Sequence, residues 1–451
     1  MARAGMSVAR INFSHGNHET HKSFVSLVRQ ASDELGKPIC ILGDLPGAKI
    51  RLGKFSEEQT NLPKGQRFVL TTRDVVGSSN EASVLMKDLP LYVEVGSSIY
   101  LADGMVKLRV MERTDDSLIC EVVEGGKISS GKGVNIPNLT ADFPSLTESD
   151  REHLEFALQN DFDMIGVSFV RKAFDLQHVR ELIRLDGGDQ LIAAKIEKRD
   201  AVENLGSIID SSDSVVVARG DLGAEVGIEN VPRLQREIVQ RCNDKGIPVI
   251  TATQMLLSMV ESETPTRAEV SDVSNAVRDG TDAVMLSEET AIGRHPVEAV
   301  AMAAKISAIT EESLPYSEIL ASRRETIQRA VDDAISYAAC EVGLQLGATA
   351  LVAPTRSGST ARRVARFRPP LPIIALTVKE RVARQLALSW GVQPHLIEAM
   401  KNHNELFSIA EKAVVTHGLA KEGDRIVIVA GDLASPFGTT NLLKVQTVKG
   451  A

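Results

Sequence analysis

The sequence repeats one unit, in which a short apolar run ends in polar or charged residues and is followed by an amphipathic stretch. Helical patterns over 173–185, 231–245 and 269–278 separate several of the runs. Strand–helix alternation at this spacing predicts a parallel sheet, and its repetition predicts an α/β fold of the (β/α)8 TIM-barrel type. Seven runs leave this barrel one strand short of eight. The runs are 8–13, 39–44, 164–169, 191–197, 215–221, 249–253 and 283–287.

The long segment between the second and third runs has a different pattern of apolar and polar residues. Short alternating strands follow one another at 67–72, 99–102, 106–111 and 118–123. This pattern predicts a small all-β domain, inserted at the barrel face where active sites lie and able to act as a lid.

A third region begins after a predicted helix over 297–313 and a polar stretch, 315–325, which is typical of a linker. Its strands, at 349–355, 371–377, 393–397 and 424–430, alternate with helices and predict an open α/β domain. We therefore expect four segments. They are a first barrel part (1–46), the inserted lid domain (47–143), a second barrel part (144–318) and a carboxyl-terminal regulatory domain (319–451).

Composition excludes several classes of protein. The 51 basic against 60 acidic side chains give a net charge of -9, which argues against nucleic-acid binding. Apolar runs are broken by charge long before the roughly 18 residues that a membrane span needs. The four cysteines are far apart without CxxC spacing, so neither a disulfide framework nor a zinc site is indicated. The first residues carry no apolar leader, so we expect a cytoplasmic protein.

Charged residues follow two neighbouring predicted strands. Lys195 and Glu197 lie two apart, as do Arg219 and Asp221, so each pair points to one side of its strand. Glu197 and Asp221 are then placed to share a divalent cation, and Lys195 to stabilise a transferring anionic group. An equally weighted alternative is a structural ion pair between Glu197 and Arg219.

Further groups suited to anions occur near the same strand ends. Gly220 opens a predicted helix whose backbone N–H groups suit carboxylate or phosphate, although a tight turn is the simpler interpretation. Hydroxyls at Thr253 and Ser287 lie on the same face, where threonine is also common as strand filler. Donors suited to phosphate oxygens stand at Arg10, Asn12, Ser14 and Arg51.

Six segments, in this order, resemble the signature segments of the pyruvate kinase family, and the resemblance covers essentially the whole chain. It implies Mg²⁺-dependent transfer of a phosphoryl group from phosphoenolpyruvate to ADP, giving pyruvate and ATP in the last step of glycolysis, by an allosteric homotetramer. The family's barrel opens with a strand and a helix that precede the segment matching 1–5. The segments are Val8-Ala-Arg-Ile-Asn-Phe-Ser-His-Gly16, Lys195-Ile-Glu197, Ala218-Arg-Gly-Asp-Leu-Gly223, Ala252-Thr-Gln-Met-Leu256, Pro265-Thr-Arg-Ala-Glu269 and Met285-Leu-Ser-Glu-Glu-Thr-Ala291.

The resemblance also implies a role for each matching residue. Glu197 and Asp221 hold Mg²⁺, with Mn²⁺ as an alternative ion, and Lys195 and Thr253 are catalytic. The implied substrate-binding residues are Arg10, Lys195, Gly220, Asp221, Thr253 and Ser287. The implied nucleotide-binding residues are Arg10, Asn12, His15, Arg51 and Lys132.

A monovalent-cation site is altered relative to K⁺-dependent members of the family. Asn12, Ser14 and Asp44 match the family's K⁺ ligands, but Lys49 stands where those members have Glu. An ammonium there would take the cation's electrostatic place, so we predict activity without K⁺. The alternative is that Lys49 is a solvated loop lysine.

The third region contains one segment suited to a phosphate. Hydroxyls and backbone N–H groups follow a strand and open a helix, which is typical of a phosphate cradle but also of an ordinary helix cap. No arginine falls within 402–409, where family members responsive to fructose 1,6-bisphosphate place one. We therefore predict a sugar-monophosphate or AMP effector, held by Thr355, Ser357, Gly358, Ser359 and Thr360.

Two other functions remain open at this stage. A Mg²⁺-dependent lyase acting on 2-oxo acids would use the same metal and barrel, although the lid with Lys132 and the nucleotide-side arginines argue against it. A non-catalytic ligand-binding remnant is the other alternative, because the first strand of the family's barrel is not found.

Overall fold

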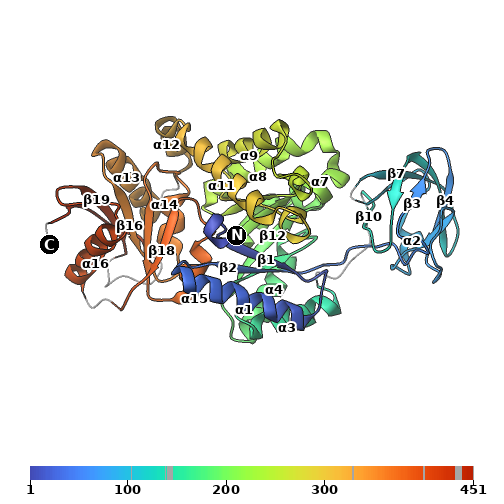
Figure 1. Ribbon diagram of the computed structural model, residues 1–451, viewed down its shortest axis with the longest axis horizontal. Helices are drawn as coiled ribbons and strands as arrows, with labels where there is room; N and C mark the ends of the chain where they lie inside the picture. The colour runs from blue at the N-terminus through green and yellow to red at the C-terminus, as the bar shows by residue number, and fades with distance from the viewer. Residues whose placement is uncertain are drawn as a thin grey trace.

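The computed structural model describes residues 1–102, 104–137, 139, 146–327, 330–399, 402–431 and 439–449. Three bodies lie in a row (Figure 1): the inserted β domain at one end, the barrel in the middle and the carboxyl-terminal domain at the other end. None of the helices within these ranges is long and apolar enough to span a membrane.

The barrel body is a curled sheet of parallel strands surrounded by helices (Figure 1). In sheet order its seven strands are β1 (Val8–Asn12), β2 (Cys40–Asp44), β11 (Met164–Val167), β12 (Leu191–Ile196), β13 (Ser214–Ala218), β14 (Val249–Ala252) and β15 (Ala283–Met285). The helices are α1 (His18–Leu35), α3 (Glu148–Gln159), α4 (Ala173–Leu185), α5 (Arg199–Glu203), α6 (Leu205–Ser211), α7 (Arg219–Val226), α8 (Val231–Lys245), α9 (Arg267–Asp279), α10 (Glu288–Ala291) and α11 (Pro296–Glu312). Short 3-10 turns lie at Ala2–Ala4 (η1), Ile228–Asn230 (η2) and Leu257–Val260 (η3).

Burial explains why these strands read as continuous apolar runs. Every residue of β2, β11, β13 and β14 is buried, as expected for a parallel sheet covered on both faces. The helices between them begin with ordinary caps, such as the reciprocal Thr266–Glu269 capping box of α9. The predicted parallel barrel-type fold is therefore confirmed.

The sheet has two ends within the described ranges, namely β1 and β15. The turn η1 precedes β1 and packs against α11. Gly5, the residue that follows η1, has a positive φ of +122°. A Cβ at Gly5 would lie 2.9 Å from the Cβ of Ala304, so the chain passes α11 at a distance that only glycine tolerates.

The barrel interior is completed from outside the barrel. Leu42, Met164, Val216 and Ile250 form an apolar cluster that also contains Leu388 of the carboxyl-terminal domain, which is only 3% exposed. One body therefore contributes core to the other.

The inserted β domain has its own apolar core, built on a six-stranded sheet and a two-stranded sheet. The larger sheet has the order β10 (Val134–Asn135), β6 (Ser98–Leu101), β7 (Val106–Arg113), β8 (Ser117–Glu124), β4 (Arg67–Thr71) and β5 (Glu81–Ser83). The smaller pairs β3 (Thr60–Leu62) with β9 (Gly126–Ile128), and one short helix, α2 (Leu89–Tyr92), lies between β5 and β6. The predicted start of this domain, at 47, falls between β2 and β3, whereas its predicted end, at 143, lies outside the described residues.

The carboxyl-terminal domain is a five-stranded sheet flanked by helices. Its strand order is β18 (Val392–Leu396), β17 (Ile373–Thr377), β16 (Ala350–Pro354), β19 (Arg425–Ala430) and β20 (Leu442–Thr447). The helices are α13 (Val331–Gln345), α14 (Ser359–Ala365), α15 (Glu380–Leu386) and α16 (His403–Thr416). The antiparallel edge strand β20 was not predicted, because 442–447 mixes polar and apolar residues as edge strands do.

The predicted linker over 315–325 was wrong. That segment folds into α12 (Tyr316–Arg323) and the turn η4 (Arg324–Thr326), and the side chain of Leu320 is buried in the core of the carboxyl-terminal domain. The predicted division at 318/319 thus falls inside α12. The segment is mostly polar, so its composition does not show that one residue, Leu320, is buried.

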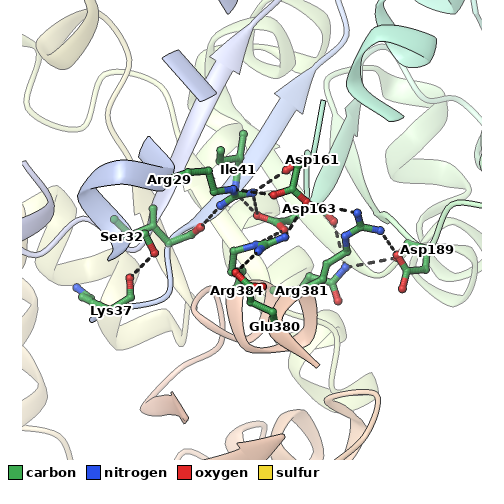
Figure 2. A network of polar contacts seen from close by, with 12 residues as sticks. Arg29, Ser32, Lys37, Ile41, Asp161, Asp163, Asp189, Glu380, Arg381 and Arg384 are labelled. Carbon is green, nitrogen blue, oxygen red and sulfur yellow. Dashed lines mark hydrogen bonds and ion pairs between the residues drawn. The ribbon is translucent and has the colours of Figure 1, made fainter. Parts of the chain in front are cut away.

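A charged network joins the barrel to the carboxyl-terminal domain (Figure 2). Asp163, immediately before β11, is fully buried and accepts hydrogen bonds from Arg384 Nε at 2.7 Å and Arg29 Nη2 at 2.8 Å. Arg384 lies on α15 and also reaches Asp161, while Arg381 on the same helix pairs with Asp189. Ion pairs and the apolar Leu388 contact together fix the two bodies against each other.

Candidate active site

Lys195 occupies the centre of the carboxyl ends of the strands. From β12 its Nζ lies 3.1 Å from Asp44 Oδ1 and 3.0 Å from Glu197 Oε1, and it donates a 2.7 Å hydrogen bond to Ser168 Oγ. Burial disfavours the ammonium, but the charges of Asp44 and Glu197 outweigh burial and raise the pKa of Lys195. Lys195 is therefore a mostly buried side chain that stays positively charged.

Arg10, in the middle of β1, and Asp44, at the end of β2, form a second pair, in which Asp44 is buried and Arg10 is partly buried. Arg10 Nε donates to Asp44 Oδ2 at 2.7 Å, and its Nη2 lies 2.5 Å from the same oxygen. Burial opposes ionisation of Asp44, yet the nearby cations Lys195 and Arg10 prevail and lower the pKa of its carboxyl. Parallel pairing of β1 with β2, in which Asn12 faces Asp44, brings these residues together.

Glu197 is held from two sides just after β12. The side chain is 1% exposed, and its Oε2 accepts a 2.7 Å hydrogen bond from the backbone N–H of Phe169, which has a positive φ of +54°. Burial raises the pKa of Glu197; Lys195 opposes this shift and the charge of Asp221 adds to it. Two carboxylates close enough to influence each other form an environment that favours a cation.

Asp221 lies in the first turn of α7, directly after β13. Its Oδ1 is 2.8 Å from Lys49 Nζ and accepts a 3.3 Å hydrogen bond from Asn135 Nδ2 on β10 of the inserted domain. Burial opposes ionisation, but Lys49, Lys195 and the Asn135 hydrogen bond together outweigh burial and lower the pKa of Asp221. The inserted domain thus contacts the barrel's candidate metal ligand directly, as its predicted position at the active face requires.

Arg219 does not pair with Glu197, so the structural ion pair considered for them was wrong. Its guanidinium donates to the carbonyl oxygen of Thr253 at 2.6 Å and lies 2.8 Å from Asp272. Thr253 has φ +77°, a strained conformation for a β-branched residue that Arg219 stabilises. The Thr253 methyl lies 3.0 Å from where a Cβ at Gly220 would stand, so position 220 favours glycine.

Ser287 follows β15, and its backbone N–H donates to Glu289 Oε2 at 2.7 Å. Glu289 is buried and also accepts from the backbone N–H of Leu256, so it joins the loops after β14 and β15. Glu288, by contrast, is exposed at the start of α10.

The other predicted ligands of nucleotide and monovalent cation lie on two loops. Asn12 Oδ1 accepts from the backbone N–H of Ser14, and His15 is exposed, its carbonyl oxygen accepting from His21 Nε2. Arg51 donates to the carbonyl oxygen of Gly131 beside the exposed Lys132, within the inserted domain. The structure therefore places Arg51 and Lys132 together, in the inserted domain rather than among the strand ends of the barrel.

The predicted effector segment is a tight turn between β16 and α14. The Gly358 N–H donates to Thr355 Oγ1 at 3.0 Å, Ser357 Oγ lies 3.1 Å from Ser359 Oγ, and the Thr360 hydroxyl is buried against Thr440. The turn brings four of the five predicted residues to one place, while Thr360 points inward as a structural residue.

Two adjacent carboxylates fit a divalent ion of the Mg²⁺ type. Magnesium is usually bound by one or two carboxylates, with water and substrate oxygens completing its shell. Glu197 and Asp221 supply that number from neighbouring strand ends, and no cluster of three or more ligating side chains suited to a metal occurs in the described ranges. The donor set therefore agrees with an ion that also needs substrate oxygens.

A parallel barrel with a charged, buried centre at the carboxyl ends of its strands defines a (β/α)-barrel enzyme. The family model "Pyruvate kinase, barrel domain" matches residues 1–300, and "Pyruvate kinase, alpha/beta domain" matches residues 333–446. The chain belongs to the pyruvate kinase family, as its motifs predicted.

Several pyruvate kinases are similar to this chain over nearly its full length. The chain is 41% identical over 449 residues to a pyruvate kinase of Clostridium acetobutylicum, covering 99% of this chain and 95% of that protein. It is 42% identical to a pyruvate kinase of Thermococcus litoralis, covering 99% of this chain and 94% of that protein. A pyruvate kinase of Geobacillus stearothermophilus is also 42% identical, with 77% of its length covered.

Sequence reasoning missed two residues of the site. Ser168 directly follows β11, inside the run at 164–169, and could have been recognised as a polar residue at a strand end, like Thr253. Asn135 gives no such indication, because β10 is only two residues long and its partner Asp221 lies 86 residues away.

Proposed function

We propose that this protein transfers a phosphoryl group from phosphoenolpyruvate to ADP, giving pyruvate and ATP. The observation that carries the proposal is the mostly buried Lys195 ammonium, held between the carboxylates of Asp44 and Glu197 beside a third carboxylate, Asp221. Phosphoryl transfer depends mainly on positioning and charge neutralisation, and this arrangement provides both.

Each residue of the site has a role that follows from its position. Lys195 stabilises negative charge on the transferring group as it leaves the enolate oxygen of phosphoenolpyruvate for the terminal phosphate of ADP. The backbone N–H groups of Gly220 and Asp221, at the start of α7, hold the substrate carboxylate, together with the hydroxyls of Thr253 and Ser287. The enolate then takes up a proton to become pyruvate.

Cationic side chains are available to bind the phosphates of the nucleotide. Arg10, Arg51 and Lys132 provide cationic contacts for its phosphates, with Asn12 and His15 beside them. Lys132 and Arg51 lie in the inserted domain, so movement of that domain would bring them to the nucleotide.

Glu197 and Asp221 would hold Mg²⁺, with Mn²⁺ as a substitute, and the ion would supply charge neutralisation on phosphate oxygens. Metal binding can be tested without an activity assay, by titrating the purified protein with Mn²⁺ and following the signal of free Mn²⁺ by electron paramagnetic resonance. We expect saturable Mn²⁺ binding that Mg²⁺ displaces; absence of any saturable binding, with and without phosphoenolpyruvate, would remove the metal from the proposal.

K⁺ independence follows from the position of Lys49. Its ammonium lies 2.8 Å from Asp221 and adds positive charge to the site, in which Asn12, Ser14 and Asp44 match the family's cation ligands. We predict full activity in a buffer whose only monovalent cation is a bulky tetraalkylammonium, and a K⁺ requirement in Lys49→Glu. Strong activation of the unmodified protein by K⁺ at matched ionic strength would contradict this prediction.

The turn at Thr355 and Ser357 to Ser359 is the proposed site of a monophosphate effector, either a sugar monophosphate or AMP. Titration of each compound at subsaturating phosphoenolpyruvate tests it, with Ser357→Glu as the variant in which a carboxylate repels the phosphate. A stronger response to fructose 1,6-bisphosphate would overturn the choice. We also propose a homotetramer in the cytoplasm, which sedimentation and fractionation would test.

The overall experiment is a coupled assay of the purified protein with phosphoenolpyruvate, ADP and Mg²⁺, following pyruvate formation. We expect turnover that requires both substrates and stops on addition of EDTA. Binding of phosphoenolpyruvate without turnover would instead favour a ligand-binding protein, and cleavage of a 2-oxo acid without ADP would favour a lyase.

A further inference from the structure

Phe169 lies two residues after β11, at the end of the barrel where the candidate site lies. Its side chain is partly buried, and its backbone has a φ of +54°, in the left-handed region. A bulky residue adopts this conformation only at a cost in free energy, so the surrounding structure must hold it there. Strain of this kind is concentrated at functional sites, and the contacts of Phe169 show what it achieves here.

The backbone of Phe169 holds the first candidate metal ligand, Glu197. The Phe169 N–H donates to Glu197 Oε2 at 2.7 Å, while Lys195 Nζ lies 3.0 Å from the other oxygen, Oε1. Glu197 is only 1% exposed, so these two contacts fix the orientation of its carboxylate. A backbone N–H is a neutral donor, and it orients Glu197 without placing a further positive charge beside a metal ion.

The ring of Phe169 supports two lysines that hold the helix of the second ligand. Lys49 Nζ lies 5.9 Å and Lys198 Nζ 5.7 Å from the ring centroid, within the range of cation–π attraction. Lys49 pairs with Asp221 at 2.8 Å, and Lys198 pairs with Glu225 at 2.6 Å. Asp221 and Glu225 are four residues apart on α7, so they project from the same side of that helix. The ring is therefore linked to both carboxylates, through one lysine each.

Gly47 leaves the space that the ring of Phe169 occupies. It has φ +69°, and a Cβ there would lie 2.9 Å from Phe169 Cδ2 and 3.0 Å from Ser168 Cβ. The Gly47 N–H donates at 2.9 Å to Oδ1 of Asp150, a buried residue of α3, which holds the backbone in place. A larger residue at position 47 would therefore push the ring away from the two lysines.

We propose that Phe169 is a positioning residue that sets the relative placement of Glu197 and Asp221, the two carboxylates that would share a divalent ion. The inference rests on the metal site of the proposed function. The Phe169 N–H orients Glu197, and its ring orients Asp221 through the lysines that pack on it. Two carboxylates from different strand ends can share one ion only at a suitable separation, and residues that orient metal ligands typically contribute about 10–100-fold to affinity.

Mn²⁺ titration of the full chain, followed by electron paramagnetic resonance, tests the role of the ring. Phe169→Leu retains the backbone N–H and much of the apolar volume, but it removes the π face on which the lysines pack. We expect this variant to bind Mn²⁺ about tenfold more weakly than the unmodified protein. Phe169→Tyr keeps the ring and should restore the affinity of the unmodified protein.

A first control removes another ring that carries a lysine. Phe174, on α4, is 63% exposed and lies 5.8 Å from Lys172 Nζ, so Phe174→Leu loses a similar contact elsewhere and should leave Mn²⁺ affinity unchanged. The unfolding midpoint of each variant in EDTA shows that the chain remains folded.

A second pair of variants moves the ring without changing it. Gly47→Ala displaces the Phe169 ring and should weaken Mn²⁺ binding as Phe169→Leu does. Gly65→Ala is the matched control, because Gly65 has φ +83° but, among the described residues other than its chain neighbours, no atom lies within 4 Å of where its Cβ would stand. It introduces similar backbone strain and should leave Mn²⁺ affinity unchanged.

Hydrogen exchange at single-residue resolution provides a measurement that needs no metal. In EDTA the Phe169 amide should exchange slowly, because its N–H is bonded to the buried Glu197 carboxylate. Glu197→Ala should speed this exchange about tenfold or more, since a hydrogen bond to a charged acceptor is lost. Equal exchange of the Phe169 amide in Glu197→Ala and the unmodified protein would overturn the backbone contact and the proposal with it.

The Mn²⁺ titrations separate failure of this inference from failure of the metal site. Equal affinity in Phe169→Leu and the unmodified protein would overturn the positioning role while leaving the metal site in place. A loss in Phe169→Tyr as large as in Phe169→Leu would also contradict the proposal, because the ring would then not be the cause. No saturable Mn²⁺ binding by the unmodified protein would instead remove the metal site and, with it, this inference.

Discussion

The Asp163→Asn substitution tests how strongly the barrel and the carboxyl-terminal domain are joined. The Asp163 carboxylate accepts three hydrogen bonds, from the Ile41 backbone N–H at 2.8 Å, Arg29 Nη2 at 2.8 Å and Arg384 Nε at 2.7 Å (Figure 2). An asparagine of the same shape has one acceptor oxygen, so its Nδ2 must face a donor on one side. The substitution therefore removes a charge and sets the asparagine N–H group against at least one other donor, Arg384 Nε when the oxygen keeps the bonds from Ile41 and Arg29.

The expected cost follows from burial. Asp163 is fully buried, and the Arg384 side chain is 7% exposed. Breaking a buried ion pair by removing one partner costs about 3–5 kcal/mol, because the remaining charge stays desolvated. At roughly 2 °C per kcal/mol for a large cooperative unit, the unfolding midpoint should fall by about 6–10 °C.

Differential scanning calorimetry resolves this effect, with Asp189→Asn as the matched control. Asp189 is 61% exposed in its pair with Arg381, in the same network (Figure 2). An exposed pair contributes about 0–1 kcal/mol, so the control should shift the midpoint by no more than about 2 °C. We also expect Asp163→Asn to separate the transitions of the barrel and the carboxyl-terminal domain.

The reasoning would be refuted by a midpoint shift in Asp163→Asn as small as in Asp189→Asn. That result would mean that solvent reaches the buried pair or that apolar contacts, such as that of Leu388, hold the two bodies together alone.

Three further predictions concern single side chains. Lys195→Met should lower kcat by about 10²–10³-fold with phosphoenolpyruvate binding retained, while Lys245→Met, at an exposed pair, leaves kcat unchanged; unaltered kcat in Lys195→Met would remove Lys195 from the reaction. Asn135→Ala should weaken Mn²⁺ binding about tenfold, because it removes the hydrogen bond that orients Asp221 from the inserted domain. The control is Asn61→Ala, at an exposed position on β3. Equal Mn²⁺ affinity in the two variants would show that Asn135 does not orient the metal ligand. Burial and His417 lower the pKa of His395 to about 4, so the folded state resists protonation and stability is lost as pH falls from about 6.5 towards 4. The midpoint of His395→Phe should therefore fall less over that range, and parallel pH profiles would contradict this.

The sequence alone determined the local elements and the chemical identity of the site. Helices α4 and α8 cover the predicted ranges 173–185 and 231–245, because hydrophobic periodicity records which face of a helix is buried. Lys195, Glu197 and Asp221 were predictable for a related reason, since parallel strands bring their carboxyl ends to one edge.

Only the tertiary structure decided which partner each charged side chain has. Lys49 meets Asp221 across 172 residues, and Arg219 stabilises Thr253 instead of Glu197. Leu388, in a domain with its own sheet, completes the barrel interior, and Arg368, just after α14, pairs with Asp282 of the barrel. Such contacts depend on how whole elements dock, and sequence periodicity reports that a residue is buried but not what it is buried against.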